Sequence, residues 1–299
     1  MQLSLSFLAT DLRQLPDLGA YGNTAVEAVL FQEADLLDSP WKLAWENTEK
    51  AVRLYGNKHV TFHFPMNGSD YVKNKKVFKR LIEAYKRASD LGLNGLVVHS
   101  NRIRPAHEWS KFDVSQEQRA VLERLLDVID KNFDKNTWLG LENMPLIGNA
   151  GYELDPLFCL AKDFLILPDR LSVVWDICHA TSSIEYVKKI KSSENLKGLN
   201  MRHASKEDFD FTLIYMKVRH WHFASFKNLN IPRERSSLID GLLPSEGMLR
   251  PLIYENLLKQ IARYSDKDST VNFEVQETDY VQRRRGPEII DWAKYILDI

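Results

Sequence analysis

The chain has only two cysteines in 299 residues, Cys159 and Cys178, which excludes a scaffold of several disulfide bonds. No apolar run approaches the roughly 18 residues that a membrane-spanning helix needs. The first residues have no basic leader before their apolar stretch, so they predict a strand and not a signal peptide. A net charge of −1 creates no overall field that would attract nucleic acid. We therefore expect a cytoplasmic protein with no membrane partner, and no protein partner is indicated.

A glycine-rich phosphate-binding loop is also missing. Thr10-Asp11-Leu12 follows the first predicted strand, where a doubly wound nucleotide-binding sheet would have its glycine-rich turn. What the chain does have is a regular alternation of short apolar runs and amphipathic helical stripes, such as Leu122 to Phe133 and Leu249 to Ile261. Eight candidate strands, with helices after most of them, predict one (β/α)8 TIM barrel domain over residues 1–299. An open doubly wound sheet is the alternative.

Six of the apolar runs end in an ionisable residue. A buried strand that ends in such a group is destabilised unless the group finds a partner, because desolvating a charge costs several kcal/mol. In a parallel barrel, the carboxyl ends of all strands meet on the face where active sites of this fold are built. The six side chains are therefore expected to meet, although they are far apart in the sequence. They are His63, His99, Glu142, Asp176, His222 and Glu274.

The types of these residues indicate a metal or catalytic site. Imidazole nitrogen and carboxylate oxygen suit zinc or manganese and not copper(I). His179 follows Asp176 by three residues, so one loop would supply two ligands. Each histidine taken singly is better explained as a hydrogen-bonded core group, and His220 is predicted to be a packed imidazole one layer deeper than His222. The six residues taken together favour a shared site, and hence an enzyme.

These residues in their local settings resemble endonuclease IV and the wider xylose-isomerase-like barrel superfamily. Trp175-Asp176-Ile177-Cys178-His179-Ala180 is similar to the family's Asp-Thr-Cys-His-Ala ligand loop. Leu141-Glu142-Asn143-Met144 is similar to its Leu-Glu-Asn-Thr, and the segment from Trp221 to Lys227 to its seventh strand. His63 with Pro65 resembles the family's His-Ala-Pro. The similarities run in order over nearly the whole chain.

The resemblance implies a site for three zinc ions. His63, His99 and Glu142 would bind the first ion. The second would be bound by Glu142 together with Asp176, His222 and Glu274. The third would take His179 and Asp240, but Leu242 stands where the family has the last histidine of an Asp-x-His pair. Two or three Zn²⁺ ions, or Mn²⁺, are therefore expected.

The hydrolysis of a phosphodiester is the first activity that the resemblance implies, with abasic-site DNA or a related molecule as the substrate. Basic residues in loops of the same barrel face would bind its phosphates, although the alternative for each is a solvated loop charge. The residues expected to do so are Arg102, Arg104, Lys227, Arg233 and Arg235, together with Arg283-Arg284-Arg285 after the last strand.

Two other functions remain open at this stage. Sugar isomerases and epimerases of the superfamily keep one metal, and Glu142 and Glu274 would then serve as acid and base on a substrate such as a phosphorylated sugar. A barrel that binds a phosphorylated ligand without turnover is the third hypothesis. We favour the hydrolase, because His63, His99, His179 and Asp240 all fall where the multinuclear family needs them.

Overall fold

Eight parallel strands close into a barrel in the computed structural model, which describes residues 1–22, 24–102, 104–105, 113–131, 136–147, 153–154, 157–190, 204–230 and 237–299. The order around the barrel is β1-β12-β9-β8-β6-β4-β3-β2. The predicted (β/α)8 barrel is confirmed, and an open doubly wound sheet is excluded. The barrel strands are β1 (Gln2–Leu8), β2 (Thr24–Val29), β3 (Val60–His63), β4 (Gly95–Val98), β6 (Trp138–Glu142), β8 (Ser172–Asp176), β9 (Val218–Phe223) and β12 (Thr270–Phe273).

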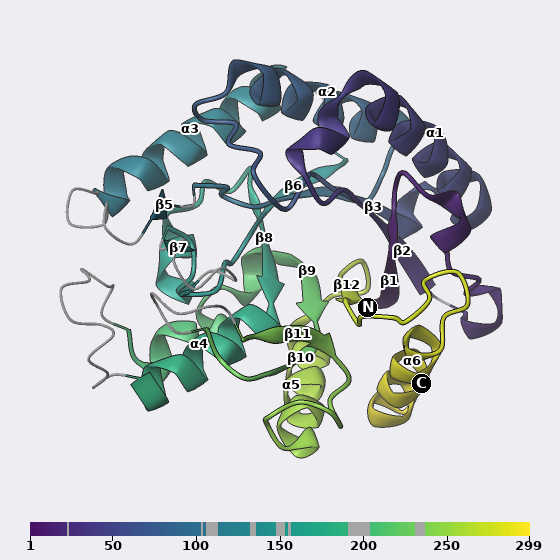
Figure 1. Cartoon of the computed structure of the whole chain (residues 1–299), viewed down its shortest axis with the longest axis vertical. Coiled ribbons are helices and arrows are strands. Elements are labelled where there is room, and N and C mark those ends of the chain that lie inside the picture. The colour runs from purple at the N-terminus through teal and green to yellow at the C-terminus, as the bar shows by residue number, and fades with distance from the viewer. Residues whose placement is uncertain are drawn as a thin grey trace.

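Helices surround the barrel, and α1, α2 and α3 form one arc around it in Figure 1. The connection from β1 to β2 uses the short 3₁₀ turns η1 (Leu12–Gln14) and η2 (Gly19–Tyr21), and η6 (Ala161–Ile166) lies between β6 and β8. Within the described residues, no helix is both long and apolar enough to cross a membrane. The α-helices are α1 (Asp38–Tyr55), α2 (Lys75–Leu91), α3 (Val114–Lys131), α4 (Ile177–Ile190), α5 (Pro251–Tyr264) and α6 (Arg285–Leu297).

The hydrophobic core fills the layer between the strands and the helices. Trp41 and Trp45 of α1 show how this layer is packed: the Trp45 ring stacks on Phe62 of β3 at a centroid distance of 4.3 Å, and the two tryptophan rings meet edge to face at 5.7 Å. Because side chains alternate along a strand, the residues on either side of Phe62 point into the barrel instead. The pair of tryptophans is therefore helix packing.

The inside of the barrel is polar for much of its depth. Glu27, His63, Glu142, His222 and Asn272 come from five different strands and are at most 1% exposed. Buried polar groups are stable only when they are paired. Their contacts with one another form the candidate site.

Candidate functional site

Glu142 lies at the centre of the site. It is the last residue of β6, and its side chain is 1% exposed. Its Oε2 atom lies 3.2 Å from His63 Nε2 and 3.1 Å from His99 Nε2. Its Oε1 atom lies 3.2 Å from His222 Nδ1. Strand ends that are distant in the sequence therefore bring three imidazoles to one carboxylate, as the strand-end pattern predicts.

Backbone carbonyls orient two of these imidazoles. His63 Nδ1 lies 2.7 Å from the Phe64 carbonyl oxygen, and His99 Nδ1 lies 3.0 Å from that of Met66. A carbonyl only accepts, so each Nδ1 carries a hydrogen, and a ring that binds a metal would do so through Nε2. Both Nε2 atoms point toward Glu142, which is the orientation that a metal ligand needs.

The acidic side of the site is built by β8 and the start of α4. Asn143 donates from Nδ2 to the Asp176 carbonyl oxygen at 3.1 Å, which links the ends of β6 and β8. His179 lies in the first turn of α4 and not in a loop, because the helix begins directly after Asp176. Its backbone N–H donates to Asp176 Oδ1 at 2.7 Å, and its Nδ1 lies 2.8 Å from the Asn143 carbonyl. Strand and helix together therefore place Asp176 and His179 beside Glu142.

Two groups of potential ligands share Glu142. One is His63, His99 and Glu142, and the other is Glu142, Asp176 and His222, with the ligand atoms of each group within 4.8 Å of one another. Glu274 lies beside the second group, with Oε1 3.6 Å from His222 Nδ1.

The expected third group is less complete. His179 and Asp240 line the same cavity, yet no three-ligand cluster within the described part of the chain contains either of them. Leu242 ends β11 (Ile239–Leu242), which pairs with β10 (Ser225–Lys227).

The electrostatics of these residues suit a cation. Burial raises the pKa of Asp176, and burial together with the charges of Glu142 and Asp176 raises the pKa of Glu274 well above its ordinary value. Burial would also raise the pKa of Glu142, but His222 and His99 outweigh it and hold that pKa well below the ordinary value. His222 Nδ1 is buried and makes no hydrogen bond, although two carboxylates face it. Repelling carboxylates and an unsatisfied imidazole nitrogen are what a bound divalent ion would stabilise.

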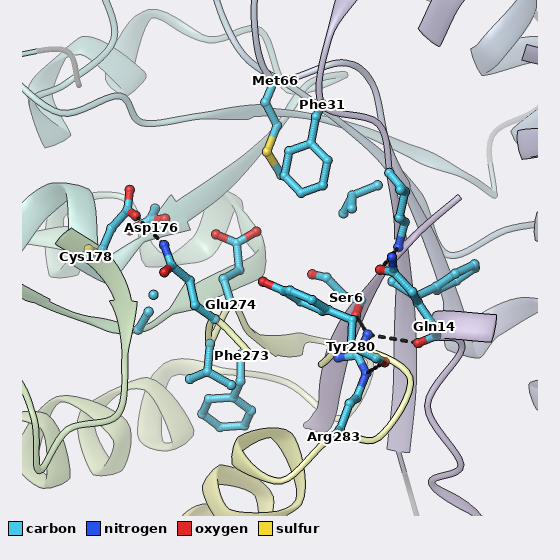
Figure 2. Close-up of a pocket in the computed structure, with 18 of the residues that line it drawn as sticks. Ser6, Gln14, Phe31, Met66, Asp176, Cys178, Phe273, Glu274, Tyr280 and Arg283 are labelled. Carbon is cyan, nitrogen blue, oxygen red and sulfur yellow. Dashed lines mark hydrogen bonds between the residues drawn. The ribbon is translucent and has the colours of Figure 1, made fainter. Parts of the chain in front are cut away.

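A cavity of about 300 Å³ opens beside the ligand groups and is lined by Asp176, His179 and Glu274. Figure 2 shows the Glu274 carboxylate projecting into it, with Phe31 and Met66 opposite and Asp176 at one side. Arg283 also lines the cavity, but its Nη2 donates to the backbone oxygens of Ser6 at 2.6 Å and Gln14 at 2.9 Å. The cavity therefore combines one apolar wall with an acidic floor.

Of the basic residues expected to bind phosphate, Arg283 alone lines this cavity in the described part of the chain. Arg102 is 4% exposed and pairs with Asp70 at 3.0 Å and with Glu117, so its charge is already balanced. Lys227 is exposed at the end of β10. Arg233, Arg235 and the side chain of Arg104 lie outside the described residues.

The structure adds one acidic residue that the strand-end pattern misses. Glu27 sits in the middle of β2, and with His220 and His222 it forms a third cluster of potential ligands. This cluster lies on the side of the His222 ring that faces away from Glu142. His220 is buried at the depth predicted for a packed imidazole. The sequence does carry a signal for Glu27, because it is a single carboxylate inside a mostly apolar strand. An unpaired charge is hardly ever buried in a strand, so this carboxylate indicates a buried partner.

Solved structures confirm the architecture. A D-tagatose 3-epimerase-like protein is 19% identical with a TM-score of 0.58, covering 100% of this chain and 98% of its own. Endonuclease IV from Thermus thermophilus is 15% identical with a TM-score of 0.58, again covering 100% and 98%. The IOLI protein with a bound zinc atom is 14% identical with a TM-score of 0.58, covering 99% and 96%.

No functionally curated protein sequence matches the chain. At these identities the structural similarity shows the fold alone. The sequence from residue 17 to residue 266, by contrast, matches the model of one protein family. The chain belongs to the xylose isomerase-like TIM barrel family.

Proposed function

We propose that this chain is a divalent-metal-dependent hydrolase of phosphodiesters. The observation that carries the proposal is that one buried carboxylate, Glu142, is shared between two separate ligand groups. His63, His99 and Glu142 would hold one ion, and Glu142, Asp176, His222 and Glu274 the other. Two ions at such a site would activate water and neutralise charge on the phosphoryl oxygens.

The chain's own residues would position the substrate between these groups and the cavity wall. Glu274 faces the cavity with its side chain 26% exposed, so it would contact the substrate as well as a metal. Phe31 and Met66 would cover the substrate from the opposite side and exclude water. The likeness to endonuclease IV makes abasic-site DNA the first substrate to test.

The test is metal analysis combined with hydrolysis assays. The purified protein should hold about two zinc equivalents. It should cleave an abasic-site duplex or, as a smaller substrate, bis(p-nitrophenyl) phosphate. His63→Asn should remove one zinc equivalent and abolish the hydrolysis. The reason is that His63 belongs only to the group with His99, which a two-metal hydrolase needs and a one-metal enzyme does not. A protein that holds one metal and cleaves neither substrate would refute the proposal.

A sugar epimerase is the second candidate, and the completeness of one ligand group favours it. Glu142 and Glu274 both face His222 Nδ1, and Asp176 completes a four-residue set for a single ion. One glutamate would then remove a proton from a carbon next to the carbonyl of a sugar small enough for the cavity, and the other would return a proton to the opposite face of the same carbon. Incubation with a ketohexose in D₂O tests this hypothesis, since epimerisation would introduce solvent deuterium into the sugar. His63→Asn would preserve that exchange, which separates the two candidates.

A further inference from the structure

Glu27 is a completely buried carboxylate to which neither candidate reaction assigns a role. It lies in the middle of β2 with an exposed fraction of 0%. β2 is not a neighbour of β9 in the barrel, so the contact between Glu27 and the histidines of β9 crosses the barrel interior. An ionised side chain at such a place is strongly destabilising unless several donors satisfy it.

Three polar side chains surround this carboxylate. Glu27 Oε2 lies 2.8 Å from His220 Nε2 and 3.3 Å from His222 Nε2. Oε1 accepts a hydrogen bond from Asn272 Nδ2 at 3.0 Å, and the same amide also donates to Ser6 Oγ at 2.8 Å. The carboxylate therefore acts as an acceptor whose position is determined by side chains from β1, β9 and β12.

His222 faces the ligand cluster with the opposite nitrogen from its neighbours. His63 and His99 direct Nε2 toward Glu142, and each has Nδ1 within hydrogen-bonding distance of a backbone carbonyl. His222 directs Nδ1 toward Glu142 Oε1 and Glu274 Oε1, while its Nε2 points down toward Glu27. A neutral imidazole that binds a metal through Nδ1 must carry its hydrogen on Nε2, and that hydrogen needs an acceptor inside the barrel.

We propose that Glu27 is a positioning residue, which accepts the Nε2–H hydrogen of His222 and thereby presents the Nδ1 lone pair of His222 to the ion held by Glu142 and Asp176. The inference rests on the metal site of the proposed function. Histidine ligands commonly donate their second N–H to a carboxylate or carbonyl, which determines the ring's orientation. Here a carboxylate would do for His222 what the carbonyls of Phe64 and Met66 do for His63 and His99. His220 shares the same oxygen and packs edge to face on His222, at a centroid distance of 5.1 Å.

The first test is zinc affinity, measured by competition with a chromophoric chelator. Glu27→Gln keeps the length of the side chain but replaces one acceptor oxygen by an amide that donates. We expect zinc binding to weaken by about 10- to 100-fold, the usual effect of losing such a partner. The matched control is Glu83→Gln on α2, where a partly buried carboxylate bonds Trp41 Nε1 at 2.9 Å outside the barrel. That variant should bind zinc like the parent, and equal affinities for all three proteins would overturn the proposal.

The second test needs no variant, so it holds even if Glu27→Gln fails to fold. Long-range ¹H–¹⁵N correlation spectra of the zinc-loaded parent protein should show His222 with a hydrogen on Nε2 and with Nδ1 bound to the metal. A metal on Nε2 of His222, shared with Glu27 and His220, would overturn the proposal.

The outcomes separate this inference from the proposed function. A parent protein that binds no zinc refutes both, whereas weaker zinc binding by Glu27→Gln without any hydrolysis refutes the hydrolase alone.

Discussion

Glu142 is the residue on which both ligand groups depend. Each of its oxygens faces at least one imidazole, and Oε2 faces those of both His63 and His99. Glu142→Gln removes the negative charge but keeps the shape. We expect zinc affinity to fall by more than the roughly 10- to 100-fold that loss of an outer partner causes, because both groups lose a ligand. Metal analysis after dialysis measures the change.

The control for this change is Glu185→Gln on α4. Glu185 pairs with Lys188 at 2.6 Å and belongs to none of the ligand groups. That variant should keep its metal. Full zinc content in Glu142→Gln would remove Glu142 from the site.

Leu242 is the second residue with a clear prediction. It lies two positions after Asp240 on β11, where the family that the sequence resembles has the histidine of its Asp-x-His pair. Asp240 lines the cavity beside His179. Leu242→His should therefore complete a third ligand group and tighten binding of an additional zinc ion by about tenfold or more, equivalent to about 1.4 kcal/mol. Calorimetric titration measures this, and Leu242→Gln, which adds no imidazole, should bind like the parent.

The residues that sequence reasoning could find are those at strand ends. His63, Glu142 and Asp176 each end a strand, and the topology alone brings them together. Glu27 could not be found in this way because it lies within a strand, and its partners come from strands that only the closed barrel places opposite. The paired state of Arg102 was hidden for a similar reason: its carboxylate partners lie in a loop and on α3.

At the scale of the elements, the packing of β4 against β6 depends on a glycine beside a tryptophan. Trp138 begins β6 and lies across Gly95 of β4, so that a Cβ atom on Gly95 would fall 2.1 Å from the indole ring. The alternation of apolar runs predicts these strands but not this pairing, because the register between β4 and β6 is set only when the barrel closes. The same limit applies to the β1–β2 connection, whose short 3₁₀ turns leave no helical stripe in the sequence.

Gly95→Ala should therefore destabilise the barrel. The added methyl group has no space unless Trp138 moves, and overpacking of this kind costs about 1–3 kcal/mol or more. Urea denaturation measures the loss of unfolding free energy. Gly19→Ala is the matched control, because its Cβ would meet no atom closer than 3.5 Å and its stability should change little. Equal stability of Gly95→Ala and the parent would show that Trp138 does not pack against β4 as described.

At the scale of the whole molecule, charge is balanced overall but not locally. The 40 basic and 41 acidic residues give a net charge of −1, whereas Glu27, Glu142, Asp176 and Glu274 converge inside one barrel. Nearby histidines offset part of this charge. The pKa of Glu274 remains raised well above its ordinary value by burial and by its acidic neighbours. The fold therefore contains a repulsion that a bound cation would relieve, so metal binding and stability should be coupled.

Metal removal should therefore lower the melting temperature. A ligand at 100 times its Kd stabilises the folded state by about 2.7 kcal/mol, which for a chain of this size corresponds to a shift of about 4 °C. Calorimetry with excess EDTA, and again after zinc is added back, measures the shift and its reversal. Glu142→Gln should lose most of this dependence, because the two ligand groups share that carboxylate. A parent protein whose melting temperature is the same in EDTA and in zinc would contradict a resident metal at this site, and the polar barrel interior would then be a purely structural network.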